Sequence, residues 1–288
     1  MSLPIARTRV VGLLRLFRLE LPVAAGLCVL LGQLLALGSL PDIRTAALGF
    51  LSIFFISATA LILNDYFDYE IDLVNAPERP LPSGQVSKGD AVVLSIVVAL
   101  FGFVAAAFIR RTALVTAVAV WLVGVAYNAR FKRTGLPGNL MVAASVGMTF
   151  VFGGIAVGKT GEPLVWWFGV LAMLFDLGEE IAADAMDAEG DRRAGSRSLA
   201  VVIGVRQAVR VSAAVFAAVV IVSLLPFVMD WLDLVYLVPM VLMDGVIVVS
   251  VSRLLSTDGP PLRRDIRRIY IGGSLAILVF IVMRLAAL

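Results

Sequence analysis

Long apolar segments are the feature of this sequence that most restricts its fold. An α-helix needs about 17–25 residues to cross ~30 Å of hydrocarbon. Hydrophobic residues make up 60% of the 288 residues and charged residues only 16%, too few for the surface of a soluble protein. We therefore predict an all-α, polytopic membrane protein with nine transmembrane helices in a single domain, residues 1–288. The expected spans are residues 17–38, 45–68, 90–109, 112–129, 138–157, 163–183, 207–228, 233–252 and 268–287.

The distribution of basic residues predicts how these helices are oriented. Of the 24 Lys and Arg residues, 19 lie in the N-terminal segment or in the connections after the second, fourth, sixth and eighth expected spans. Lys and Arg mark the cytoplasmic side of a membrane protein. The N-terminus and the two long connections, residues 69–89 and 184–206, are therefore expected on the cytoplasmic face of the cell membrane. Basic loops beside an anionic lipid surface account for the net charge of +3, so we expect no nucleic-acid partner.

The sequence contains no histidine, which excludes several kinds of active site. Acid–base catalysis by histidine, His-ligated zinc or haem, and nucleophile–His pairs are all ruled out. The single cysteine, Cys28, excludes an intramolecular disulfide. Any chemistry must use carboxylates, Tyr, Lys, Arg, amides or hydroxyls.

Two acidic clusters with the same spacing stand at the cytoplasmic ends of the second and sixth expected spans. The first cluster is Asp65, Asp68 and Asp72, and the second cluster is Asp184, Asp187 and Asp191. The spacing i, i+3, i+7 places three side chains on one face of a helix. Asn64 extends the first face, and Glu180 lies one turn before the second cluster. The pattern repeats after 119 residues, which indicates that the two clusters have a common function.

These clusters oppose two ordinary preferences of helices. Like charges three or four residues apart repel, and the C-terminal end of a helix disfavours anions. A single such cluster can simply be solvated, but two matching clusters indicate a bound cation. Carboxylate oxygens suit Mg²⁺, which keeps some water and completes its shell with substrate phosphates. The sequence thus predicts Mg²⁺ and a diphosphate-bearing lipid at the membrane surface.

The segment NDYFDYEID at 64–72 resembles the first aspartate-rich motif of the UbiA superfamily of intramembrane prenyltransferases, and DAMDAEGD at 184–191 resembles the second. The flanking segments PERPLPSGQVS, YNARFKRTGLPGN and GDRRAGSRSLA agree with the same family. The resemblance implies nine helices around a central cavity, with a cytoplasmic cap formed by the two long connections. It also implies an enzyme that ionises an allylic prenyl diphosphate and transfers the prenyl group to an acceptor.

The resemblance assigns expected roles to particular residues. Metal ligands, for what we expect to be two Mg²⁺ ions, are Asn64, Asp65, Asp68, Asp72, Asp184, Asp187 and Asp191. Residues expected to bind substrate are Asn64, Arg79, Tyr127, Arg130, Lys132 and Asn139. Residues expected to act in catalysis are Asp68, Asp72, Tyr127, Lys132, Asp187 and Asp191. The ring of Tyr127 offers a π face for a carbocation, although an interfacial tyrosine is common at this depth. Each basic residue also fits the ordinary role of an anchor at the cytoplasmic surface.

The acceptor is left open between two classes. The segments RPLPSG and EGDRRAGSRSLA are closer in sequence to archaeal members of the family that prenylate geranylgeranylglyceryl phosphate. The alternative is an aromatic acceptor, 4-hydroxybenzoate or a naphthoate. Membrane lipids surround the protein in either case. A function of another class, a cation-coupled transporter, would spread its charges through the membrane depth, whereas the acidic residues here concentrate at one surface.

Four further acidic residues lie away from the ends of the expected spans or just before the second cluster. Asp176, Glu179 and Glu180 precede the second cluster, and Asp244 lies in the eighth expected span. Ionisable groups at such depth are candidates for function. The resemblance does not cover Asp244, and the sequence assigns none of the four a role.

Overall fold

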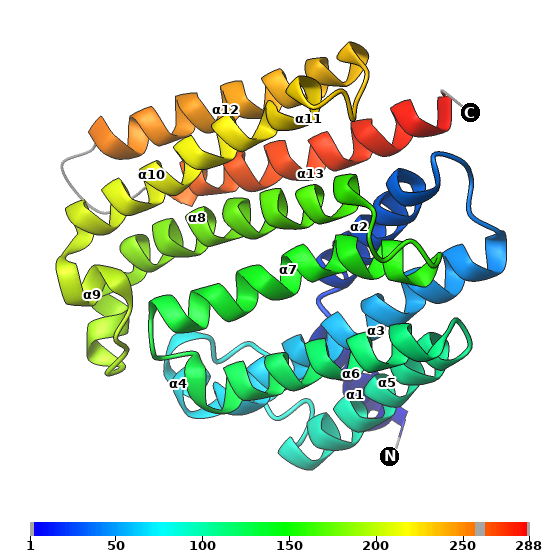
Figure 1. The fold of residues 1–288 in the computed structure, drawn as a ribbon. Helices are drawn as coiled ribbons and strands as arrows, with labels where there is room; N and C mark the ends of the chain where they lie inside the picture. Colours follow the sequence, from blue (N-terminus) through cyan, green and yellow to red (C-terminus); the bar gives the residue numbers. More distant parts are fainter. Residues whose placement is uncertain (1–2, 257–262, 287–288) are drawn as a thin grey trace.

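The structure, a computed structural model, describes residues 3–256 and 263–286, and every regular element in these ranges is a helix (Figure 1). The prediction of an all-α protein is confirmed. The helices are α1 (Leu3–Leu16), α2 (Glu20–Leu37), α3 (Ile43–Phe67), α4 (Tyr69–Asn75), α5 (Lys88–Ala107), α6 (Arg111–Ala126), the π-helix η1 (Tyr127–Phe131), α7 (Leu136–Ala156), α8 (Pro163–Arg193), α9 (Leu199–Ile203), α10 (Val205–Ser223), α11 (Leu225–Val228), the 3₁₀ turn η2 (Leu234–Tyr236), α12 (Leu237–Ser256) and α13 (Arg263–Ala286).

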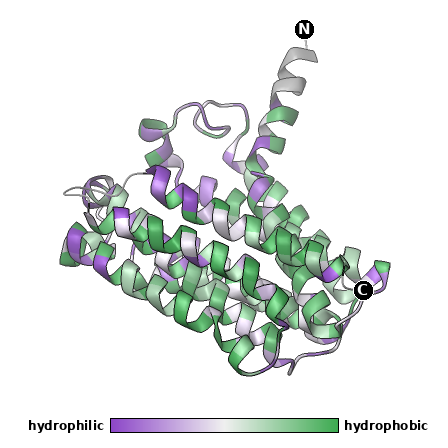
Figure 2. Ribbon diagram, turned by 90° about the horizontal axis from the view of Figure 1, so that it is seen from above, coloured by the Kyte–Doolittle hydropathy of each residue, from purple (hydrophilic) through white to green (hydrophobic). Residues whose placement is uncertain are grey.

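Eight of the nine expected spans are long and apolar enough to cross a membrane within the described residues. The remaining one, residues 163–183, forms the first part of α8, where Asp176, Glu179 and Glu180 add charge to an otherwise apolar segment. The polytopic class is confirmed, while the count of nine stays a prediction that depends on α8. Hydrophobic residues cover most of the length of the helices, and hydrophilic residues gather toward their ends (Figure 2).

Local signals in the sequence explain where several helices begin and end. The side chain of Asp42 accepts a hydrogen bond from the Thr45 amide at 2.9 Å and begins α3. Ser87 and Asp90 form a capping box at the start of α5. Gly38, in the left-handed region at φ 64°, ends α2. These caps mark the end of α2 and the starts of α3 and α5.

A close crossing of α2 and α7 forms the centre of the bundle. A Cβ atom on Gly32 would lie 2.3 Å from the Phe150 carbonyl oxygen, and one on Gly153 would lie 2.4 Å from the Val29 carbonyl oxygen. Only glycine allows two backbones to approach this closely. This pair packs against α3 and also against α8, so it holds the two helices that carry the acidic clusters.

The second long connection differs from the predicted loop. Residues 184–193 are the last turns of α8, because the helix continues past the membrane-length segment to Arg193. The first connection contains α4 and then turns through residues 77–86. Figure 1 shows α4 and α9 at the same end of the bundle. At this end the Arg197 amide donates to the Arg133 carbonyl oxygen at 2.9 Å, which joins the connection after α8 to the one after η1.

Candidate active site

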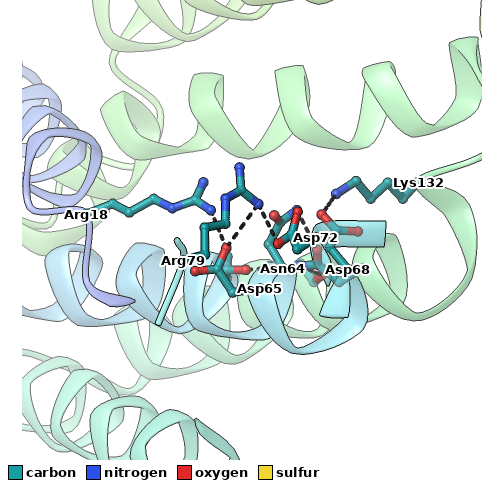
Figure 3. Close-up of polar contacts among 10 residues, drawn as sticks. Arg18, Asn64, Asp65, Asp68, Asp72, Arg79 and Lys132 are labelled. Carbon is teal, nitrogen blue, oxygen red and sulfur yellow. Dashed lines mark hydrogen bonds and ion pairs between the residues drawn. The ribbon is translucent and has the colours of Figure 1, made fainter. Parts of the chain in front are cut away.

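The first acidic cluster lies where α3 ends and α4 begins. Asp68 ends α3, and its carbonyl oxygen accepts a hydrogen bond from the Asp72 amide at 2.8 Å, so the chain stays nearly helical across the junction. The carboxylates of Asp65, Asp68 and Asp72 therefore lie along one side of this segment, as their spacing predicts (Figure 3). Asp65 and Asp72 are buried, whereas Asp68 is partly accessible.

Three basic side chains from three segments pair with these carboxylates (Figure 3). Arg18, between α1 and α2, pairs with Asp65. Arg79 lies 2.6 Å from Asp72 and 3.7 Å from Asp65, measured from its Nη1 atom. Lys132, directly after η1, pairs with Asp68. The buried acids are thus compensated by cations.

Arg79 and Lys132 were predicted to bind substrate, and the structure brings both to the first cluster. Partial burial of Arg79 disfavours its charged form, but the hydrogen bond to Asp72 and the nearby carboxylates outweigh this effect and raise its pKa above the ordinary value. Its guanidinium therefore stays charged at this site. Arg130, also predicted, is exposed, and no described side chain forms an ion pair with it.

The amide of Asn64 lies among Asp68, Asn128 and Lys132. In one orientation its nitrogen donates to Asn128 Oδ1 at 3.2 Å. In the other, its nitrogen donates to Asp68 Oδ2 at 3.1 Å and its oxygen accepts from Lys132 Nζ at 2.7 Å. Either way the Asn64 side chain belongs to the same polar group as Asp68, as the motif predicts.

The π-helix η1 positions Lys132. The Lys132 amide donates to the Tyr127 carbonyl oxygen at 2.8 Å, the i to i+5 bond that defines this form. Asn128, which is buried, fixes η1 to α3 through a hydrogen bond of 3.2 Å from its Nδ2 atom to the Ala60 carbonyl oxygen. Sequence reasoning missed Asn128 and Arg18. Neither carries a local signal, because each acts through a contact with a distant part of the chain.

The second cluster lies on the last turns of α8. Asp184 accepts a hydrogen bond from Asn139 Nδ2, on α7, at 2.8 Å. Asn139 is thus brought to the second cluster, and its role as a substrate ligand stays a prediction. No ion pair joins Asp184, Asp187 or Asp191 to another side chain in the described part of the chain. Desolvation raises the pKa of Asp187, the Arg263 charge opposes this shift, and Asp191 adds to it.

The segment from Tyr127 to Lys132 stands between the two clusters. Tyr127 lies within electrostatic range of Asp68 on one side and of Asp184 and Glu180 on the other. Lys132 pairs with Asp68 and also interacts with the Glu180 charge. The two clusters, far apart in sequence, therefore face a common region through this segment.

The oxygen donors of this region suit Mg²⁺ if a substrate supplies the remaining ligands. No group of three or more His, Cys, Asp or Glu side chains is arranged to hold a metal within residues 3–256 and 263–286. Mg²⁺ commonly binds through one or two carboxylates together with water and phosphate oxygens. Asp68 with Asn64, and Asp187 with Asp191, offer donor sets of this kind.

Comparison with known proteins agrees with this arrangement. Residues 25–271 match the model of the UbiA prenyltransferase family. The digeranylgeranylglyceryl phosphate synthase of Thermococcus sibiricus is 37% identical over 236 residues, 82% of this chain and 83% of the relative. A solved structure of a digeranylgeranylglyceryl phosphate synthase superposes with a TM-score of 0.80 at 29% identity, over 96% of this chain and 98% of the other.

A UbiA homolog from Archaeoglobus fulgidus, solved with DMAPP and Mg²⁺, shares the fold with a TM-score of 0.74 at 22% identity, over 96% of this chain and 100% of the other. The family match covers most of the chain and contains both acidic clusters and the segment between them. The chain therefore belongs to the UbiA prenyltransferase family.

Proposed function

We propose that this prenyltransferase uses Mg²⁺ and an allylic prenyl diphosphate to prenylate geranylgeranylglyceryl phosphate, as a digeranylgeranylglyceryl phosphate synthase. The names of its relatives support the acceptor. The observation that carries the proposal is the pairing of two acidic clusters around Tyr127 and Lys132. The clusters supply oxygen ligands, and the segment between them supplies a cation and an aromatic ring.

In this proposal, different residues hold the metal ions, support the metal ligands and add positive charge for the diphosphate. Asn64 with Asp68, and Asp187 with Asp191, would hold Mg²⁺. Asp65 and Asp72, held by Arg18 and Arg79, and Asp184, which accepts a hydrogen bond from Asn139, would support these ligands. When bound, Mg²⁺ acts as a Lewis acid that neutralises the charge developing on the leaving diphosphate. Lys132 and Arg79 add positive charge at the same end of the bundle.

Tyr127 serves the allylic part of the substrate. Its ring is half-buried and lies between the clusters, where an allylic cation would form. An aromatic face stabilises positive charge without capturing it as a nucleophile. The apolar helix walls exclude water, which would otherwise turn the cation into a prenyl alcohol.

The exposed basic residues at this end support an acceptor that carries a phosphate. Arg130, Arg133 and Arg197 are exposed, and the backbone hydrogen bond between residues 133 and 197 brings two of them together. An aromatic carboxylate is smaller and needs fewer cations. The basic loops also support a site at the cytoplasmic face, with the N-terminus on the same side.

The test is a competition between acceptors. Purified protein in nanodiscs would receive labelled geranylgeranyl diphosphate, Mg²⁺, geranylgeranylglyceryl phosphate and 4-hydroxybenzoate together. We expect an ether product from the lipid phosphate, and no transfer when a chelator removes Mg²⁺. Transfer to 4-hydroxybenzoate alone would contradict the proposed acceptor and leave the family assignment intact.

A further inference from the structure

Three acidic residues of α8 have no role in the site described so far. Asp176, Glu179 and Glu180 precede the second cluster, in the part of α8 expected inside the membrane. None forms an ion pair with another described side chain, and Asp176 Oδ2 is buried without a hydrogen-bond partner. Carboxylates at this depth are costly and are typical of functional positions.

Two of these residues, adjacent in sequence, face different surroundings. The charged groups within range of Glu180 are Lys132, beyond η1, and Asp176 and Asp184 on its own helix. Glu180 lies one turn before Asp184 on the same face of α8, and Asp184 contacts Asn139 of α7. Glu180 and Asp176 both lie within electrostatic range of Tyr127. Glu179 interacts with Asp176 and Glu180 on its own helix and, on another helix, with Tyr270 of α13. Glu180 is therefore the residue of this pair that faces the candidate active site.

The position of Glu180 along α8 matches the position of the reacting carbon. A helix rises 1.5 Å per residue, so Glu180 lies about 6 Å deeper than Asp184 and Asp176 about 12 Å deeper. The allylic carbon is bonded to the diphosphate and extends from it toward the membrane interior. With the diphosphate at the aspartate clusters, Glu180 and Tyr127 lie at the level of that carbon.

The geometry points to Glu180 as the general base that removes the proton from the acceptor hydroxyl. This inference rests on the proposed function, in which the acceptor carries a glycerol hydroxyl. The allylic C–O bond breaks, and its electron pair leaves with the diphosphate. The acceptor oxygen forms the new C–O bond to the allylic carbon, and its proton passes to the Glu180 carboxylate.

Other residues near Tyr127 are less suited to take this proton. The chain contains no histidine. Lys132 holds Asp68, and Asn139 donates to Asp184. Asp187 and Asp191 lie farther along α8, at the end where the diphosphate is placed. Asp176, also within range of Tyr127, lies one turn deeper than Glu180. The Glu180 carboxylate lies at the level of the reacting carbon, and no described side chain forms an ion pair with it.

The test compares Glu180→Gln with Glu179→Gln in single turnovers with geranylgeranyl diphosphate, Mg²⁺ and geranylgeranylglyceryl phosphate. Diphosphate release reports ionisation, and the products separate ether from prenyl alcohol. We expect Glu180→Gln to slow ether formation about 100-fold, the scale of general-base catalysis, with a much smaller effect on diphosphate release. The ratio of ether to alcohol should therefore fall. Glu179→Gln removes the same charge one residue away and should keep the wild-type ratio.

The outcomes separate the inference from the proposed function. Three results would overturn the role of Glu180. The ratio of ether to alcohol could stay unchanged in Glu180→Gln, or it could fall equally in Glu179→Gln. Glu180→Gln could also slow diphosphate release as much as ether formation. If Glu180→Gln does not fold, Glu180→Met removes the carboxylate with an apolar side chain of similar length, and a ratio equal to that of the wild type would overturn the role of Glu180. A wild-type protein that forms no ether with the lipid phosphate would instead contradict the proposed acceptor.

Discussion

At the scale of single residues, the carboxylates of the first acidic cluster are held by different cations and are not equivalent. Arg18 and Arg79 surround Asp65, Arg79 also holds Asp72, and Lys132 reaches Asp68 from the far side of the site. Asp68 is the most accessible of the three acids and shares its surroundings with the Asn64 amide. We therefore expect Asp68 to change partners when substrate binds, and Asp65 to keep its own.

The pair between Arg18 and Asp65 predicts a specific loss of stability. Arg18→Gln would remove one cation from Asp65, whose side chain is only 3% exposed. Breaking a fully buried ion pair costs about 3–5 kcal/mol. We expect roughly 1–2 kcal/mol here, since Arg79 remains and Arg18 is partly exposed, measured as a lower midpoint of thermal unfolding in detergent. Arg15→Gln is the control in the preceding helix, because Arg15 is exposed and makes only hydrogen bonds of 3.3 Å. Equal midpoints for the two variants would show that the pair contributes nothing.

The sequence predicts which side chains share a helix face, but it does not predict their partners from distant parts of the chain. The spacing of Asp65, Asp68 and Asp72 predicts one face, because it depends only on the local period of a helix. Arg18 lies 47 residues from its partner Asp65, and its backbone has φ 43°, which is uncommon for an arginine. No local pattern indicates such a contact. Arg18 could therefore be predicted as a basic residue near the membrane surface, but not as part of the site.

At the scale of secondary-structure elements, the junction between the connections after η1 and after α8 fixes the end of the bundle that carries the site. The apolar lengths predicted most helix bounds to within a few residues, since length is set by membrane thickness. The π-helix η1 could not be predicted, because it depends on Asn128 meeting α3. The extension of α8 to Arg193 follows the helical spacing of its acids but exceeds the apolar segment.

A substitution at Gly135 tests the junction between the connections after η1 and after α8. Its φ is 74°, and a Cβ atom there would lie 2.1 Å from the Arg197 carbonyl oxygen. Gly135→Ala should therefore separate the two connections and destabilise the protein by at least about 1 kcal/mol, from backbone strain alone. Thermal unfolding and prenyl transfer should both be impaired. Gly161→Ala is the control, because no atom lies within 4 Å of the position of its added Cβ. A Gly135→Ala variant as stable and active as Gly161→Ala would contradict the importance of this junction.

At the scale of the whole molecule, the α2–α7 crossing holds α3 and α8 so that two distant acidic clusters face one region. The repeated spacing in the sequence predicted two matching clusters, because both follow the same helical period. It could not place the clusters relative to each other, which depends on glycine contacts such as those of Gly32 and Gly153. The central claim of our account is that Mg²⁺ joins both clusters to one diphosphate.

The most direct measurement of this claim is the affinity for a non-hydrolysable prenyl diphosphate analogue with and without Mg²⁺. We predict that Mg²⁺ strengthens binding to the wild type at least about tenfold, or ~1.4 kcal/mol. Asp68→Asn and Asp191→Asn should each abolish most of that gain. Glu189→Gln should keep it, because Glu189 lies on the same helix but pairs with Arg192 and Arg193. A full Mg²⁺-dependent gain in either aspartate variant would contradict the claim that both clusters hold the metal.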